Sequence, residues 1–212
     1  MNFPKNQFKI KLRIAKYDRE EDKMKELTKH AIAQTLNELL ESQSIEQITV
    51  KRLVEECKIN RQTFYYHFCD IYDLIEWSLS QGLSSFLEEN PFPDGDWDVK
   101  LDHIFKFFLS RKRIILHGYS HDNRKIYERF IIKMIRPIIE EKYNSCEDSD
   151  KLPSSKKDFI IKIYVWLFVS LFFEWIENAM SPEYLDMLDD FFVLINGSME
   201  ASIQKFIIKN SI

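Results

Sequence analysis

The chain has 212 residues, 45% of them hydrophobic and 30% charged, and this balance predicts a globular protein with a sizeable core. Its formal net charge of -4 argues against wholesale electrostatic binding of nucleic acid, so any DNA-binding surface has to be local. Strands need turns that favour glycine and proline, and the chain has only four glycines and six prolines. This scarcity predicts an all-α fold of helices joined by short links.

Residues 1–23 differ from the rest of the chain because five basic residues precede the first acidic one, Asp18. These basic residues are Lys5, Lys9, Lys11, Arg13 and Lys16. Three interpretations stay open. The segment is a solvated, partly disordered tail, or a basic arm that contacts DNA phosphate, or it is not translated because translation begins at Met24.

Four helices are expected in the next fifty residues, and three of them begin at a recognisable cap. An amphipathic helix covers residues 25–43. Thr49 is an N-cap for a short second helix, and Asn60 caps a third from Arg61 to about Phe68. Asp70, with Asp73 three residues later, resembles a capping box for a longer fourth helix.

The third helix is predicted to have a buried side and an exposed side. Phe64 and Phe68 lie four residues apart and are expected to face inward. Arg61, Gln62, Tyr65 and Tyr66 are then left pointing outward, with donors and flat rings offered to a partner.

Beyond the break "ENPFPDGD" at residues 89–96, helices are expected at 96–110, 111–118, 122–143, 156–179 and 182–208. Pro137 is expected to kink or divide the third of these, and Asn196 to interrupt the last. The run from Ile163 to Phe173 is too short to span a bilayer and is interpreted as a buried helix.

Two short helices separated by a tight turn form a helix-turn-helix, whose second helix lies in the major groove of DNA. Arginine binds guanine O6 and N7, and glutamine pairs with adenine N6 and N7, which suits Arg61 and Gln62. The hydroxyls of Thr49 and the tyrosines, together with His67, can bind phosphate oxygens.

From Lys25 to about Trp77 the sequence resembles the TetR family of bacterial transcriptional regulators, most specifically in "TFYYHF" followed by "DIYDL". The resemblance implies a homodimer with a DNA-binding headpiece at residues 24–76 and a helical ligand and dimerisation domain at 77–212. It also implies that operator DNA is contacted by a set of seven residues. These are Thr49, Arg61, Gln62, Thr63, Tyr65, Tyr66 and His67.

The segments "DIYDLIEW" and "FFEWIENAMSPEYL" resemble, within that family, the dihydroxyacetone-kinase-regulator type. Two departures from the family pattern matter. Lys58 occupies the position of a turn glycine, which implies strain if its φ is positive. Ile71 and Tyr72 occupy the start of the fourth helix, where a phosphate-binding lysine is common, and the basic tail could compensate for that loss.

The aromatic residues of the C-terminal half have three open interpretations. Phe105, Phe107, Phe108 and the run from Tyr164 to Trp175 form the core, or part of a dimer interface of four helices, or the lining of a ligand cavity.

Signals for other functions are weak. His117 and His121 have a helical metal-ligand spacing, but the intervening Gly118 and the loop-like sequence after it argue against a metal site. No phosphate loop, nucleophile elbow or paired metal motif is present, so neither catalysis nor a cofactor is expected. The three cysteines lack C-x-x-C spacing and favour a reducing cytoplasm.

The predicted function is that of a cytoplasmic, ligand-responsive repressor that binds a palindromic operator as a homodimer. One alternative is an activator or co-regulator whose C-terminal domain answers to a protein partner. Another is a helical adaptor that no longer binds DNA.

Overall fold

The computed structural model describes the backbone of residues 5–210, while the side chains of residues 1–21, 185 and 210–212 lie outside that description. The described residues form helices and no strand, which confirms the predicted all-α class. The chain divides into two compact units, residues 1–78 and 79–212. The division by function at residue 76, predicted above, stays a prediction.

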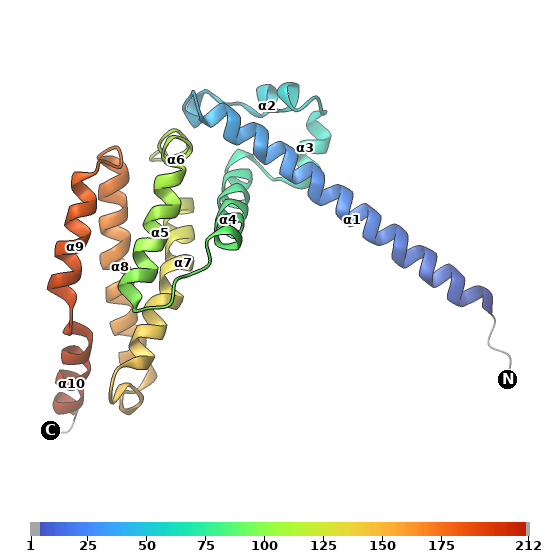
Figure 1. Cartoon of the computed structure of the whole chain (residues 1–212). Helices are drawn as coiled ribbons and strands as arrows, with labels where there is room; N and C mark the ends of the chain where they lie inside the picture. The colour runs from blue at the N-terminus through green and yellow to red at the C-terminus, as the bar shows by residue number, and fades with distance from the viewer. Residues whose placement is uncertain (1–4, 211–212) are drawn as a thin grey trace. The chain divides into compact units, whose positions relative to one another are not determined.

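The first unit consists of one long helix and two short ones, followed by the start of a fourth helix (Figure 1). They are α1 (Lys5–Leu40), α2 (Val50–Glu56), α3 (Arg61–His67) and α4 (Ile71–Glu89), with a 3-10 turn at Ile45–Gln47. The backbone of α1 is already helical twenty residues before its predicted start. The DNA contact suggested for the basic arm concerns side chains outside the described residues.

The predicted caps are present at the starts of α2, α3 and α4. Thr49 Oγ1 accepts the Arg52 N–H at 3.2 Å, and Asn60 Oδ1 accepts the Thr63 N–H at 2.8 Å. Asp70 Oδ1 accepts the N–H of Asp73 at 2.8 Å, which begins α4. Each cap satisfies a backbone donor that a helix start leaves unpaired, so the three helix starts are fixed locally.

The core of the first unit is formed where α1, α2, α3 and α4 meet. Its least exposed side chains are Ile32, Leu36, Leu53, Phe64, Phe68, Leu74 and Ile75, each at most 2% exposed. Phe64 and Phe68 therefore face inward as predicted, and their burial fixes the rotation of the short helix α3.

The turn between α2 and α3 contains a lysine in a left-handed backbone conformation. Lys58 has a φ of 55°, and its N–H is bonded to Glu55 O at 3.2 Å. The next amide, that of Ile59, reaches back to Val54 O at 3.0 Å. This is a Schellman-type helix end, in which glycine is the usual residue at the position of positive φ.

The second unit continues from α4 with six further helices. They are α5 (Trp97–Ser110), α6 (Lys112–Gly118), α7 (Arg124–Ser145), α8 (Ser154–Glu177), α9 (Glu183–Ile195) and α10 (Ser198–Asn210). Pro137 lies inside α7, so it does not divide that helix. The predicted interruption at Asn196 is present, and Gly197, with a φ of 69°, separates α9 from α10.

The centre of the second unit is built from aromatic rings on α5 and α8. The ring centroids of Phe108 and Phe172 lie 4.2 Å apart, and those of Phe105 and Trp175 lie 5.4 Å apart. Phe105, Phe107 and Phe108 are each at most 2% exposed. Packing as core is therefore confirmed for Phe105, Phe107, Phe108, Phe172 and Trp175, while the dimer-interface interpretation stays a prediction for the exposed Trp166 and Leu167 of the same run.

Helix α8 also has an exposed apolar stripe. Phe159, Ile163, Trp166 and Leu167 follow i, i+4, i+7, i+8 and are between 40% and 51% exposed. By length and composition alone, α8 and the segment 186–209 could each cross a membrane. However, more than half of the apolar stretch of α8 is buried inside the protein. The apolar run from Ile163 to Phe173 is too short to cross a membrane, but α8, which contains it, is long enough. Its burial, rather than its length, therefore identifies α8 as a core helix.

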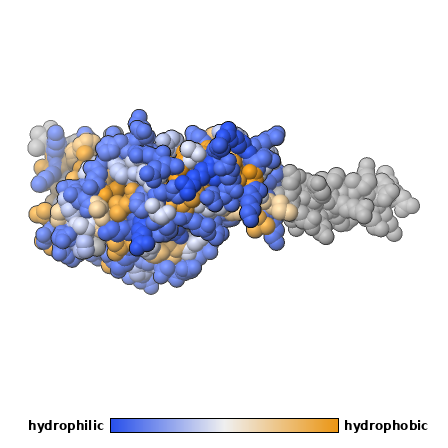
Figure 2. Space-filling view, turned by 90° about the horizontal axis from the view of Figure 1, so that it is seen from above, coloured by the Kyte–Doolittle hydropathy of each residue, from blue (hydrophilic) through white to orange (hydrophobic). Residues whose placement is uncertain are grey.

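On the face seen in Figure 2, hydrophobic residues form separate patches between larger hydrophilic areas.

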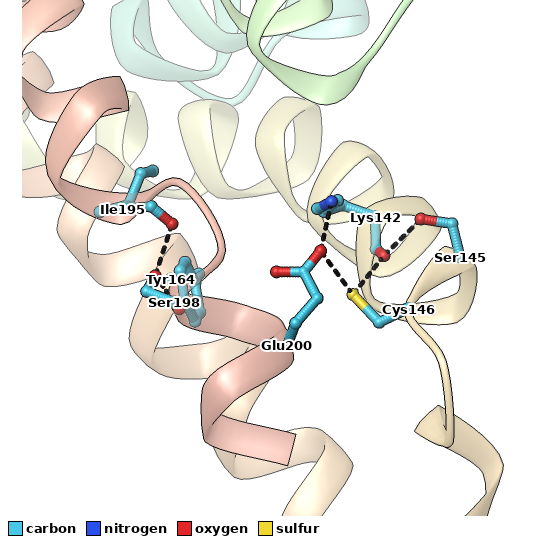
Figure 3. Close-up of polar contacts among 7 residues, drawn as sticks. All are labelled: Lys142, Ser145, Cys146, Tyr164, Ile195, Ser198 and Glu200. Carbon is cyan, nitrogen blue, oxygen red and sulfur yellow. Dashed lines mark hydrogen bonds and ion pairs between the residues drawn. The ribbon is translucent and has the colours of Figure 1, made fainter. Parts of the chain in front are cut away.

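Helix α10 is attached to α7 and α8 by polar contacts (Figure 3). Lys142 Nζ on α7 lies 2.6 Å from Glu200 Oε1, and the buried Cys146 thiol donates to the same oxygen at 3.5 Å. The hydroxyls of Tyr164 and Ser198 lie 2.6 Å apart. These contacts follow directly after the helix break, so they hold α10 in place where the backbone alone would not.

Candidate nucleic-acid interface

Helix α3 presents the side chains expected of a recognition helix. Tyr65 is 57% exposed and Tyr66 is 64% exposed, although both lie between the buried Phe64 and Phe68 in sequence. Arg61 and Gln62, in the first turn, are exposed as well. The exposed side of α3 therefore combines one fixed positive charge, an amide and two phenols, with the charge and the amide at the N-terminal end of the helix.

Thr49 and Thr63 have a second role besides the predicted DNA contact. Thr49 is exposed at the start of α2, where its hydroxyl oxygen caps that helix. Thr63 is half-buried, and its hydroxyl donates to Asn60 Oδ1 at 3.1 Å. Its side chain is thus turned towards the cap of α3. Among the predicted contact residues, Thr63 has the strongest purely structural role.

His67 lies at the C-terminal end of α3, with its ring centroid 5.0 Å from that of Tyr66. Partial burial lowers the pKa of His67 below its usual value, and the charges of Lys29 and Lys25 lower it further, against an opposing effect of Glu26. The imidazole is therefore neutral at pH 7. It can donate one hydrogen bond to a phosphate oxygen but adds no positive charge there.

The start of α4 offers no cation next to this end of α3. Ile71 is half-buried, and Tyr72 is 37% exposed. The two nearby carboxylates cap the helix, since Asp70 accepts from the first turn of α4 and Asp73 Oδ2 accepts the Cys69 N–H at 2.9 Å. Because Ile71 and Tyr72 occupy the start of α4, this helix places no lysine beside the C-terminal end of α3.

Two lysines of α1 occupy the neighbouring space, and the sequence analysis did not single them out. Lys25 Nζ lies 5.8 Å from the centre of the Tyr66 ring, and Lys29 Nζ lies 4.7 Å from that of Trp77. A signal was available in the sequence. Lys25, Lys29, Ile32 and Leu36 follow i, i+4, i+7, i+11, so both lysines continue the inward face of α1.

The second unit contains a hollow of about 340 Å³ that is separate from the aromatic core. It is lined from α4 by Ser80, Leu83, Ser84 and Leu87, from α5 by Ile104, from α7 by Phe130, Lys133, Met134, Pro137 and Ile138, and by Phe92 of the connecting segment. Most of this lining is apolar, while two hydroxyls and one ammonium can orient a ligand. The ring cluster that was considered as a cavity lining does not contribute to it.

No group of three or more histidine, cysteine, aspartate and glutamate side chains is placed to hold a metal ion among the described residues. His117 lies in the last turn of α6, and His121 lies beyond the end of that helix. The helical spacing that suggested a metal pair therefore does not belong to one continuous helix.

Comparisons with known proteins agree with this geometry. Residues 95–197 match a TetR-type family model described as "Transcriptional regulator C-terminal region". Over 106 residues the chain is 24% identical to the HTH-type dhaKLM operon transcriptional activator DhaS of Lactococcus lactis subsp. lactis, a match that covers 50% of each chain. The match therefore spans about half the length of this curated relative.

Two solved structures share the fold. The dihydroxyacetone kinase operon activator DhaS superposes with a TM-score of 0.55 at 20% identity, covering 84% of this chain and 96% of the other. A TetR-family regulator from Streptomyces coelicolor gives a TM-score of 0.53 at 13% identity, covering 86% and 89%.

The helical fold and the matched C-terminal region make this chain similar to TetR-family transcriptional regulators. Among them it resembles DhaS, the type to which the sequence resemblance pointed.

Proposed function

We propose that the protein is a sequence-specific regulator that binds a palindromic operator in the cytoplasm through the exposed side of α3. The observation that carries the proposal is the division of α3 into two sides. Phe64 and Phe68 are at most 2% exposed, whereas Tyr65 and Tyr66 are more than half exposed. Two adjacent exposed aromatic side chains are typical of an interaction surface, and beside Arg61 and Gln62 they suit DNA.

The proposal includes a homodimer formed through α8 and the helices that follow it. The exposed stripe of α8 described above is joined by apolar residues further along the chain, where Val193 is 77%, Leu194 79% and Ile208 62% exposed. Two helices per subunit can pack against their symmetry mates as a four-helix bundle, which would cover these side chains. A dimer of this kind places two copies of α3 on the two halves of a palindrome.

The hollow of the second unit is proposed as the effector site. Its volume of about 340 Å³ falls in the range of small-molecule pockets, and α4, which lines it, begins in the headpiece unit. In this mechanism α4 has two orientations, and only one of them permits the dimer to bind DNA. A ligand that binds one orientation more tightly shifts the equilibrium towards it, by an amount set by the difference in affinity. Repression that is relieved by a small apolar ligand with a polar end is the form of regulation that this site supports.

A second candidate function is activation. It is favoured by one observation, since the DhaS proteins that the chain resembles are described as activators of an operon. In that case the C-terminal unit answers to a protein partner, and co-purification would recover a stoichiometric second protein. A thermal shift with small molecules and no such partner would favour the repressor.

A gel-shift assay on DNA flanking the protein's own gene tests the operator proposal. Arg61→Ala is expected to weaken specific binding by about 1–3 kcal/mol per half-site, roughly 5- to 150-fold for each of the two headpieces, because a bidentate base contact is lost in each. Tyr65→Ala is expected to weaken it as well. Lys106→Gln serves as the control, since this exposed lysine on α5 pairs with Asp102 and loses one positive charge outside α3.

The outcomes of the gel-shift assay distinguish operator binding through α3 from the helical adaptor. Specific binding by the wild type that is lost in the α3 variants and retained in Lys106→Gln supports the proposal. Unchanged binding in the α3 variants contradicts the contact assignment. A wild type that binds no tested duplex better than a shuffled one favours the helical adaptor.

A further inference from the structure

The described side chains of the first unit, residues 22–78, have no surplus of positive charge, which DNA binding normally requires. Residues 22–78 contain ten aspartates and glutamates but only seven lysines and arginines. Phosphate contacts supply most of the affinity of DNA-binding proteins and need cations close to the duplex. The few cations beside α3 therefore decide whether this surface can hold a phosphate backbone.

The C-terminal end of α3 is the place where that need is greatest. Tyr66 is exposed there, and His67 is half-buried and neutral at pH 7. The following positions, Ile71 and Tyr72, carry no charge. A phosphate next to these groups would find hydrogen-bond donors on α3 and α4 but no positive charge from either helix.

Helix α1 provides the cations at this end. The Lys29 ammonium lies 4.7 Å from the centre of the Trp77 ring and 5.8 Å from that of Phe68, the residue that ends α3. One turn earlier, the Lys25 ammonium lies 5.8 Å from the centre of the Tyr66 ring. These rings place the two ammonium groups beside the C-terminal end of α3 and the first turns of α4.

Acidic neighbours do not cancel this charge. Asp22 lies 3.9 Å from Lys25 Nζ, and Glu26 lies 3.6 Å from Lys29 Nζ. The carboxylates are 79% and 57% exposed, although the side chains of Lys25 and Lys29 are only 35% and 22% exposed, and pairs with one partner in solvent contribute about 1 kcal/mol or less. A phosphate, which forms stronger charge-assisted hydrogen bonds, can displace such partners.

We propose that Lys25 and Lys29 bind the phosphate backbone of the operator beside Tyr66 and His67, in the place of the lysine that α4 lacks. This inference rests on the proposed function and adds a contact made by α1, outside the helix-turn-helix. Under this proposal the two lysines contribute to the affinity for DNA and to its salt dependence, while Arg61 and Gln62 discriminate between base sequences.

The salt dependence of binding tests the inference with the full-length protein. Lys25→Gln and Lys29→Gln, singly and together, are compared with wild type on a duplex from the flanking DNA and on a shuffled duplex. Each lost phosphate contact should reduce the slope of log K against log[salt] by about 0.9, hence by about 1.8 for each lysine in the homodimer and by about 3.6 in the double variant. Affinity of the dimer at 0.1 M salt should fall about 60-fold per lysine on both duplexes, so that the ratio between them stays unchanged.

Two further variants separate binding from folding. Lys23→Gln is the matched control, because residues two apart on a helix point about 200° apart and Lys23 is exposed. It should keep the wild-type slope. Lys29→Arg retains the charge and the ring contact, and should restore most of the slope lost in Lys29→Gln. Thermal unfolding of each variant shows whether the lost contact with Trp77 also lowers stability.

The possible results are distinct. If the double variant keeps the slope of wild type while wild type still binds its operator specifically, this inference is wrong and the proposed function stands. The same holds if only the ratio between specific and shuffled DNA falls. If wild type shows no specific binding at all, the proposed function and this inference fail together.

Discussion

At the scale of single residues, Lys58 shows how a local rule of backbone geometry can be broken without loss of the fold. Its φ of 55° lies in the left-handed region, where a residue with a β-carbon is strained. The hydrogen bond from the Ile59 amide to Val54 O and the burial of Val54 hold the turn in this conformation. The turn is therefore specified by the helices on either side of it rather than by its own residue.

Replacing this residue by glycine is expected to stabilise the protein. Lys58→Gly removes a strain of about 1–2 kcal/mol, against an entropic cost of about 0.5–1 kcal/mol in the unfolded chain. The net gain is about 0.5–1 kcal/mol and is measured by urea unfolding. Lys58→Ala, which loses the charge but keeps the β-carbon, should remain within about 0.5 kcal/mol of wild type. An equal gain in both variants would mean that charge, not backbone strain, is responsible.

At the scale of helices, the elements that begin with a cap were predictable from the sequence and those that depend on distant contacts were not. Thr49 and Asn60 bond to amides three residues away, so the starts of α2 and α3 could be located from sequence alone. The hollow between α4, α5 and α7 could not be located, because Ser84 and Met134 meet only after folding. For Lys25 the sequence gives only half of the contact, because the periodicity of α1 places Lys25 on its inward face but does not show that Tyr66 of α3 lies opposite.

The ion pair that attaches α10 to α7 is expected to make that helix sensitive to acid. Burial disfavours the ionised form of Glu200, but hydrogen bonds from Lys142 and from the backbone outweigh it and hold the pKa of Glu200 below its usual range. The pair therefore contributes stability above the pKa of the unfolded carboxyl, normally about 4.3. This contribution is lost as the pH falls through the lower pKa of the folded state.

Glu200→Gln should lower the stability of the protein at pH 7 by no more than about 1 kcal/mol, since the side chain is 40% exposed. The difference from wild type should shrink as the pH falls below about 4, because wild type then loses the charge at position 200 that the glutamine variant never has. Urea unfolding at pH 7 and at pH 3.5 measures both differences. Glu147→Gln, at an exposed position before the 3-10 turn Ser149–Lys151, is the control and should show little change at either pH. A difference that does not depend on pH would assign the effect to packing.

At the scale of the whole molecule, the proposed function requires two headpieces to bind at once. One α3 helix of seven residues carries few contacts, and the described headpiece side chains are acidic on balance. Affinity therefore has to come from joining two weak binding events in a dimer, where the second becomes intramolecular and can raise affinity by about 10²–10⁴. The exposed apolar side chains of α8, α9 and α10 are the part of the chain that can form that dimer.

This requirement predicts a strict dependence on the spacing of the two half-sites. Inserting five base pairs at the centre of the operator rotates one half-site by about half a turn of the duplex, because B-DNA has about 10–10.5 base pairs per turn. Affinity should then fall towards that of a single half-site, by about 10²-fold or more, when measured by fluorescence anisotropy at fixed salt. A duplex with one half-site scrambled gives the reference value for a single headpiece. Equal binding to the original, expanded and half-site duplexes would show that one headpiece suffices, and would contradict the proposed action as a dimer.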